Sequence, residues 1–204
     1  MPEYKKNFWD ERYSGTDYTY GTEPNLFFKD QLDKIIPQGK LLLPGEGEGR
    51  NAVYAAKLGW KVDAFDQSQV AKSKANKLAK ENNVSINYET IDLEEFKPKT
   101  NYYDCAAIIF VHLPLDIRSE FYKKVVDSIK PAGKIILELF STDQLGKNSG
   151  GPQNLEMLST IADIKNNFDK LRPLILKEEN IYLDEGDKHS GEASVIRFVG
   201  EKAM

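Results

Sequence analysis

Residues 41–51 read LLLPGEGEGRN, and this stretch decides the fold that we predict for the chain. An apolar run breaks here into glycine at every second position, which predicts a buried strand that turns tightly into a helix. The next apolar run, residues 62–65, is followed by Asp66. Such a turn lets backbone N–H groups approach a ligand, and a carboxylate after the following strand can accept both hydroxyls of a ribose. We therefore expect a nucleoside site that includes Gly45, Glu46, Gly47, Gly49 and Asp66.

The spacing of these glycines narrows the choice of ligand. The dinucleotide fingerprint places its third glycine where this chain has Arg50, and a P-loop needs a Lys-Ser or Lys-Thr pair that does not follow here. Glu46 and Glu48 stand between the glycines, and carboxylates beside a pyrophosphate would repel it. They suit a cationic ligand end instead. This chemistry points to S-adenosylmethionine, which carries an ammonium and a sulfonium group.

Length, composition and charge set the broad class of protein. A chain of 204 residues with 40% apolar residues can form one sizeable core, so we expect a single domain over residues 1–204. The net charge of −4 argues against a nucleic-acid partner, and the single Cys105 fits a reducing compartment. No apolar run has the length of a membrane span. We therefore expect a cytoplasmic protein, monomeric and without a membrane or nucleic-acid partner.

Apolar runs bounded by Gly, Pro and Asp alternate with segments of helical periodicity, a pattern typical of an α/β protein with a parallel sheet. Strands are expected at residues 40–44, 61–65, 85–90, 103–111, 134–140, 177–183 and 193–201. Helices are expected at residues 23–36, 50–58, 69–82, 115–129 and 155–168. The core then spans residues 40–204, preceded by an aromatic lid and a helix over residues 1–36.

This order of elements resembles the class I S-adenosylmethionine-dependent methyltransferases, whose Rossmann-like, doubly wound sheet has seven strands with an antiparallel last strand between the fifth and sixth. The resemblance covers nearly the whole chain. The segments FWDERYSGTDYTYGTEPNLFF, EGEGRN, HLP, GGP and LDEGDKHSG are similar to small stand-alone bacterial methyltransferases of the tellurite-resistance and thiopurine type. The chain departs from the family at Leu43, where an acidic residue is usual, and Glu46 is the candidate replacement.

The resemblance implies S-adenosylmethionine as cofactor, S-adenosylhomocysteine as product and a small-molecule acceptor that is methylated by in-line displacement. It also implies further contacts with the cofactor. Asp92 and Leu93 would lie over the adenine, and Phe110 and Val111 beside the methionine part. Gln67, next to the ribose-binding aspartate, is expected to contact the adenosine. The alternative for Asp92 is a helix N-cap, because EEF follows it closely.

Three residues are candidates for the chemistry. The chain has two histidines, His112 after the fourth strand and His189 after the sixth, and both are expected on the ligand side of the sheet. Histidine titrates near neutral pH and can take a proton from an acceptor, although a solvent-facing role is the alternative for each. Tyr20 is the preferred lid residue. We expect no metal site, because the histidines lack partners at ligand spacing.

Two other functions stay open at this point. A nucleotide-binding oxidoreductase of the Rossmann type is disfavoured by Arg50 and by the terminal hairpin. A non-catalytic module that binds the cofactor is compatible with the sequence, because methyl transfer has no obligatory catalytic residue whose loss would show.

Overall fold

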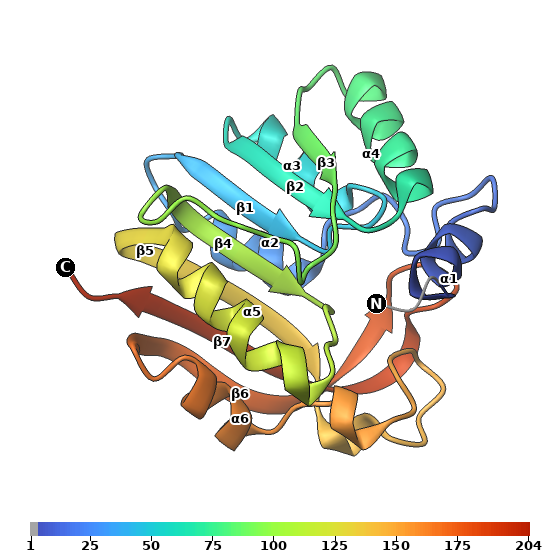
Figure 1. Cartoon of the computed structure of the whole chain (residues 1–204). Helices are drawn as coiled ribbons and strands as arrows, with labels where there is room; N and C mark the ends of the chain where they lie inside the picture. Colours follow the sequence, from blue (N-terminus) through green and yellow to red (C-terminus); the bar gives the residue numbers. More distant parts are fainter. Residues whose placement is uncertain (1–3) are drawn as a thin grey trace.

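Seven strands form one sheet in the order β3-β2-β1-β4-β5-β7-β6, as the computed structural model shows (Figure 1). The structure describes residues 4–204, so residues 1–3 of the expected N-terminal lid lie outside the described part. The strands are β1 (Lys40–Pro44), β2 (Lys61–Asp66), β3 (Asn87–Thr90), β4 (Tyr103–Ile109), β5 (Ile129–Phe140), β6 (Leu171–Asp184) and β7 (Ser190–Lys202).

The direction of the strands confirms the predicted sheet. Strands β3, β2, β1, β4 and β5 pair in parallel, whereas β7 runs antiparallel to both of its neighbours, β5 and β6. The last strand therefore lies between the fifth and the sixth. In such an arrangement the carboxyl ends of β1, β2 and β4 meet at one edge, where open α/β sheets bind ligands.

Helices cover both faces of the sheet, so its strands are buried on two sides. On one face α2 (Leu26–Leu32), α3 (Arg50–Lys57) and α4 (Gln69–Glu81) pack over a core that includes Phe28 and Leu41. On the other face α5 (Leu115–Ser128) and α6 (Ile161–Asn167) pack over a core that includes Tyr122 and Ile135. Figure 1 shows α5 in front of the sheet and α2 behind it.

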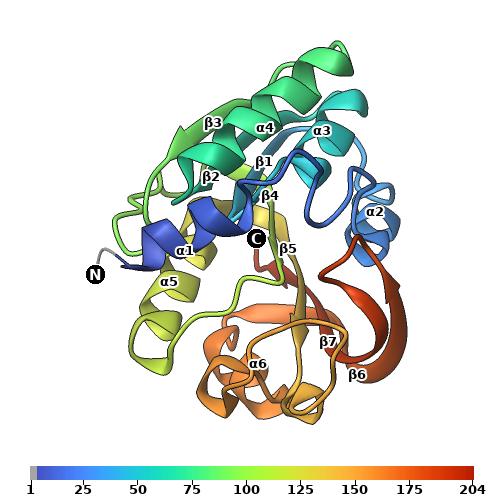
Figure 2. The same ribbon diagram turned by 90° about the vertical axis from the view of Figure 1, so that its right-hand side faces the viewer.

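The N-terminal helix α1 (Tyr4–Arg12) lies across the edge where the parallel strands end, which Figure 2 shows from the front. The side chain of Asp10 in this helix contacts the N-terminus of α4. The Asp10 Oδ1 accepts hydrogen bonds from the Ser68 hydroxyl at 2.6 Å and from the Val70 backbone N–H at 3.2 Å. A carboxylate is favourable at a helix N-terminus, so this contact fixes the helix over the strand ends.

The sequence did not predict α1 as a helix, and it was wrong about several boundaries. The helix expected at residues 155–168 is two short helices, a 3-10 helix at Leu155–Met157 and α6. Between them Ser159 forms an isolated bridge with Ser141, and a capping box at Thr160 and Asp163 starts α6 afresh. A further 3-10 helix, Thr142–Gln144, follows β5. The strand β5 begins at residue 129 instead of 134, and β6 begins at 171 instead of 177.

Candidate functional site

The turn between β1 and α3 depends on glycine at two positions. Gly45 and Gly47 both have a φ of 62°, a left-handed conformation that favours glycine. A Cβ on Gly45 would lie 2.8 Å from a methyl carbon of Val111, and one on Gly47 would lie 2.9 Å from the Tyr13 hydroxyl. The turn is therefore closely surrounded, and the absence of side chains keeps the backbone open to a ligand.

Gly49 has a different role from the other two glycines. It is the N-cap residue of α3 with a φ of 91°, and it does not line the cavity described below. A Cβ here would lie 2.6 Å from the Cβ and 2.8 Å from the Cα of Ala75 in α4. This glycine lets two helices approach each other, so its contribution to the site is packing.

Asp66 lies at the end of β2, and its side chain is oriented by two backbone donors. The Gly47 N–H donates to Oδ2 at 3.1 Å, and the Ser68 N–H donates to Oδ1 at 2.9 Å. Burial raises the pKa of this carboxyl to about 6 despite these hydrogen bonds. A carboxylate has about four acceptor positions, so two remain for further donors such as ribose hydroxyls.

The two glutamates of the turn are both bound by the protein. Glu46 Oε1 accepts a hydrogen bond from the Ala52 N–H at 2.7 Å, at the start of α3, and burial raises the pKa of this side chain to about 7. Glu48 accepts from the Lys74 ammonium at 2.7 Å and from the Thr19 N–H at 2.7 Å. Glu48 is thus neutralised by Lys74 and holds the N-terminal segment. Glu46 lines the cavity described below, so it stays the candidate for the charge that Leu43 does not supply.

A cavity of about 980 Å³ opens where the parallel strands end. It brings together twelve of the thirteen residues proposed from the sequence, the exception being Gly49. These twelve are Tyr20, Gly45, Glu46, Gly47, Asp66, Gln67, Asp92, Leu93, Phe110, Val111, His112 and His189. Gly150, Gly151 and Pro152 also line the cavity.

The polar side chains of Gln67 and Asp92, which were expected to contact the adenosine, differ in their hydrogen bonds. Gln67 Oε1 is buried and has no hydrogen-bond partner among residues 4–204, so an acceptor is available beside Asp66. Asp92 Oδ1 accepts from the Glu94 backbone N–H at 3.0 Å. Residues 93–95 form a turn and not a helix, so this contact is a turn hydrogen bond and not the helix cap that was the alternative role; Asp92 also lines the cavity.

The other end of the cavity is lined by a cluster of aromatic rings. The rings of Phe110 and Phe140 lie 4.6 Å apart, and His189 lies 4.7 Å from Phe110 and 4.5 Å from Tyr20. His112 stacks on Phe140 at 5.4 Å. Phe110 has a φ of 54°, which is strained for a bulky residue and is typical of functional sites.

The two histidines are held differently. His112 Nδ1 lies 3.2 Å from the Met157 carbonyl oxygen, and burial lowers the pKa of this ring to about 3. His189 Nδ1 lies 3.3 Å from Glu185 Oε2, and burial lowers its pKa below the ordinary value as well. Both rings are therefore neutral near pH 7, the form in which histidine can accept a proton.

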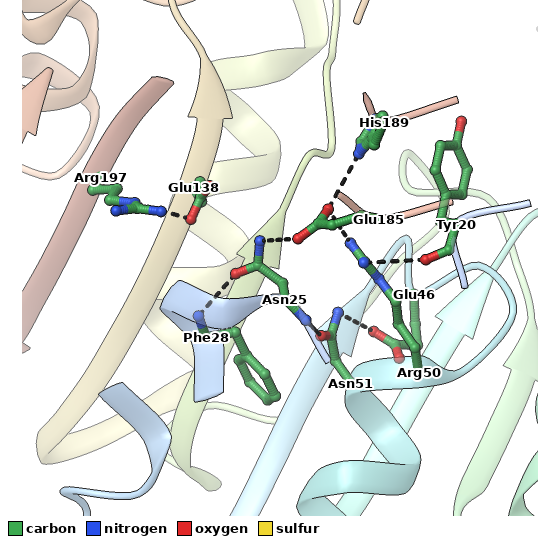
Figure 3. A network of polar contacts seen from close by, with 10 residues as sticks. All are labelled: Tyr20, Asn25, Phe28, Glu46, Arg50, Asn51, Glu138, Glu185, His189 and Arg197. Carbon is green, nitrogen blue, oxygen red and sulfur yellow. Dashed lines mark hydrogen bonds and ion pairs between the residues drawn. The ribbon is translucent and has the colours of Figure 1, made fainter. Parts of the chain in front are cut away.

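Sequence reasoning missed four residues that shape the site. Phe140 lines the aromatic end, and Arg50, Glu185 and Asn25 form a polar network behind it (Figure 3). Arg50 was considered only as a departure from a glycine pattern. A usable signal existed for Phe140, because it ends a predicted strand on the ligand side of the sheet.

Within residues 4–204 no group of three or more His, Cys, Asp and Glu side chains is arranged to hold a metal ion. In the same part of the chain no helix combines the length and apolar character needed to cross a membrane.

The chain is similar to known methyltransferases. A family described as "Methyltransferase domain" matches residues 42–133. The probable S-adenosyl-L-methionine-dependent methyltransferase TehB of Haemophilus influenzae is 25% identical over 145 residues, which are 69% of this chain and 48% of that protein. The chain thus spans about half the length of this curated relative.

Solved structures show the same fold. The crystal structure of TehB from Haemophilus influenzae has a TM-score of 0.74 and 19% identity, over 97% of this chain and 67% of that one. A structure concerned with the conversion of a disulfide bond into a thioacetal group during echinomycin biosynthesis has a TM-score of 0.76 and 15% identity, over 98% of this chain and 92% of that one.

Proposed function

We propose, from the premise that this chain belongs to the class I S-adenosylmethionine-dependent methyltransferases and resembles TehB, that it methylates a small-molecule acceptor and releases S-adenosylhomocysteine. The observation that carries the proposal is the cavity itself. One continuous space has a carboxylate suited to ribose at one end and an aromatic cluster at the other. A donor and an acceptor can therefore meet in the same enclosure.

The residues present fit the cofactor. The left-handed glycines Gly45 and Gly47 have no room for a Cβ beside Val111 and Tyr13, so the turn carries no side chains and its backbone can approach the amino-acid part of the donor. Asp66 has two free acceptor positions for the ribose hydroxyls, and Gln67 Oε1 is a buried acceptor in need of a donor. S-adenosylmethionine would supply an electrophilic methyl group on a sulfonium centre.

The aromatic end suits the transfer step. In-line displacement mainly requires that acceptor, carbon and sulfur are aligned and that water is kept out. The faces of Tyr20, Phe110 and Phe140 can stabilise a nearby cation by cation–π attraction, typically by about 0.5–2 kcal/mol each. Helix α1 lies over the strand ends (Figure 2), and its residues Phe8 and Trp9 line the cavity together with Tyr20, so these side chains would help to exclude water.

We further propose that the chain acts as a cytoplasmic monomer on an acceptor that is not nucleic acid. The net charge of −4 supports this proposal, since a nucleic-acid enzyme needs a positive surface. A concave cavity of this kind also favours a small acceptor over a polymer.

The direct test is to incubate the purified chain with S-adenosylmethionine and a panel of acceptors. The panel should include a thiol, a selenium or tellurium oxyanion, an alcohol, an amine and a carboxylate, with release of S-adenosylhomocysteine as the readout. We expect turnover with at least one member. Tight binding of the cofactor with no turnover on any member would favour the non-catalytic module, and absence of binding would refute the proposal.

A further inference from the structure

Glu185, in the turn between β6 and β7, is surrounded by three donors (Figure 3). Its Oε1 accepts a hydrogen bond from Asn25 Nδ2 at 2.9 Å. Its Oε2 accepts one from the Arg50 guanidinium at 2.8 Å and lies 3.3 Å from His189 Nδ1. Only 10% of the Glu185 side chain is exposed, so these donors replace water around the carboxylate.

The charge of Glu185 is fixed by these neighbours. Burial alone would raise the pKa of the carboxyl, but the hydrogen bond from His189 and the charge of Arg50 outweigh it and lower the pKa to about 2. Glu185 is therefore ionised at any pH at which the protein works. An ionised carboxylate only accepts hydrogen bonds.

Asn25 holds Glu185 from the second side, and its own orientation is determined by the fold. Asn25 is the N-cap residue of α2, and its Oδ1 accepts a hydrogen bond from the Phe28 N–H at 2.8 Å. Its backbone N–H donates to Asn51 Oδ1 at 3.0 Å. Because the amide oxygen is occupied by the cap, the amide nitrogen must be the group that faces Glu185.

These contacts determine which nitrogen of His189 carries its proton. Since Glu185 can only accept, the ring nitrogen facing it, Nδ1, must be the donor. In a neutral ring the other nitrogen, Nε2, then carries the lone pair. His189 lines the cavity, where its ring contacts Tyr20, Phe110 and Phe140. The lone pair is thus held at the acceptor end of the site.

We infer that Glu185 is a positioning residue that fixes the Nδ1-protonated tautomer of His189, and that His189 Nε2 accepts a proton from a thiol or hydroxyl acceptor. This inference rests on the proposed methyl transfer. The acceptor's sulfur or oxygen forms the new bond to the methyl carbon with its lone pair, while the carbon–sulfur bond of the donor breaks and its electron pair stays on the donor's sulfur. The acceptor's proton passes to Nε2, and the resulting imidazolium returns it to water.

The other candidate bases are less well arranged. His112 Nδ1 faces a neutral backbone carbonyl, that of Met157, and its Nε2 is buried. A carbonyl stabilises a developing imidazolium less than a carboxylate does. Burial raises the pKa of Tyr20, so its phenol keeps its proton near neutral pH. Among the three candidates, His189 is the one whose hydrogen-bond partner is a carboxylate, which stabilises the protonated ring.

The charged groups around His189 oppose one another. Burial lowers its pKa first, and Arg50 of α3 and Arg12 of α1 lower it further, whereas Glu185 raises it. The His112 ring belongs to the same aromatic cluster and is neutral. Removing the charge of Glu185 should therefore lower the pKa of His189 again, and shift the acidic limb of the pH–rate profile to lower pH.

The first test compares two thiol probes. A nitro-substituted thiophenol is already ionised at pH 7.5, and 2-mercaptoethanol is largely protonated. For His189→Gln we expect a loss of about 10²- to 10⁴-fold in kcat with 2-mercaptoethanol, the usual contribution of a general base. The loss with the thiophenol should be below about tenfold, because that probe has no proton to give up. Equal losses with both probes would overturn the inference.

The second test reads the tautomer without turnover. The chain has only two histidines, so long-range ¹H–¹⁵N spectra contain two imidazole systems, which His189→Gln assigns. We expect His189 to be protonated at Nδ1 in the parent protein and to lose this preference in Glu185→Gln. The matched control is Glu178→Gln, which removes an exposed carboxylate from β6, the strand before this turn, and should leave the spectrum unchanged. A parent His189 protonated at Nε2 would overturn the inference.

Two readouts separate the possible failures. If the parent protein does not bind S-adenosylmethionine in calorimetry, the proposed function has failed, whereas the tautomer measurement still tests the role of Glu185. If cofactor binding is intact and His189→Gln leaves the ratio of the two thiol rates unchanged, only this inference has failed. Should Glu185→Gln not fold, the parent spectrum and the His189→Gln rates decide the matter.

Discussion

Replacing Asp66 tests the assignment of the ribose site. Its carboxylate already accepts hydrogen bonds from the N–H groups of Gly47 and Ser68, and two acceptor positions remain. A hydrogen bond to a charged group is worth about 1.5–3 kcal/mol. Two ribose hydroxyls would therefore contribute about 3–6 kcal/mol, which corresponds to about 10²- to 10⁴-fold in affinity.

We expect Asp66→Ala to weaken binding of S-adenosylhomocysteine by that factor in isothermal titration calorimetry. This variant also leaves the N–H groups of Gly47 and Ser68 without their acceptor, so its melting temperature should fall. Asp66→Asn keeps the shape and one acceptor oxygen, and should show an intermediate loss. The control is Asp63→Asn, on the same strand and bound to Asn87 and Tyr103, away from the cavity. A folded Asp66→Ala protein with parental affinity would refute the ribose assignment.

Three further changes follow from the packing and the charges. Gly49→Ala should lower the melting temperature by several degrees, because the new Cβ would clash with Ala75. The cofactor affinity of the folded variant should stay within about threefold of the parental value, which calorimetry at low temperature can check. In Gly186→Ala the new Cβ would lie 2.6 Å from the Thr19 carbonyl oxygen and push the segment before residue 21 away. We therefore expect a higher KM for the donor and faster proteolysis of that segment. Unchanged proteolysis would argue against this contact between Gly186 and Thr19. Burial raises the pKa of Glu138 to about 7. Between about pH 4.5 and 7 the folded protein therefore keeps a proton on this side chain that the unfolded chain has lost. The contribution of Glu138 to the free energy of unfolding falls as pH rises through that window. The free energy of unfolding of Glu138→Gln, measured by urea titration, should therefore rise by up to about 3 kcal/mol relative to that of the parent between pH 4.5 and 7.5. A difference between the two proteins that stays constant over this range would contradict the assignment.

The parts of the fold that the sequence predicts are those with a local cause. The run LLLP followed by alternating glycines is a buried strand and a tight turn, and β1 and the start of α3 lie where predicted. Gly45, Gly47 and Asp66 meet because parallel strands end at one edge, a rule that needs only the order of elements.

The parts that escaped prediction depend on distant contacts. Glu185 binds Arg50 across 135 positions of sequence and Asn25 across 160, and neither spacing leaves a local pattern. Helix α1 has few apolar positions on one face, so its sequence gives a weak helical signal. Its position depends on the contact between Asp10 and Ser68 at the start of α4, which is not visible in the sequence. The break after the 3-10 helix Leu155–Met157 coincides with the Ser141–Ser159 bridge, another contact across the fold, whereas the start of α6 has a local cause in the capping box of Thr160 and Asp163.

The central claim is that the glycine turn and Asp66 receive the adenosyl donor. A crystal structure of the chain with S-adenosylhomocysteine tests it most directly. We expect both ribose hydroxyls within hydrogen-bond distance of the Asp66 carboxylate, the amino-acid part over Gly45 and Gly47, and the sulfur beside Phe110. A ligand bound elsewhere, or with its ribose away from Asp66, would contradict the account.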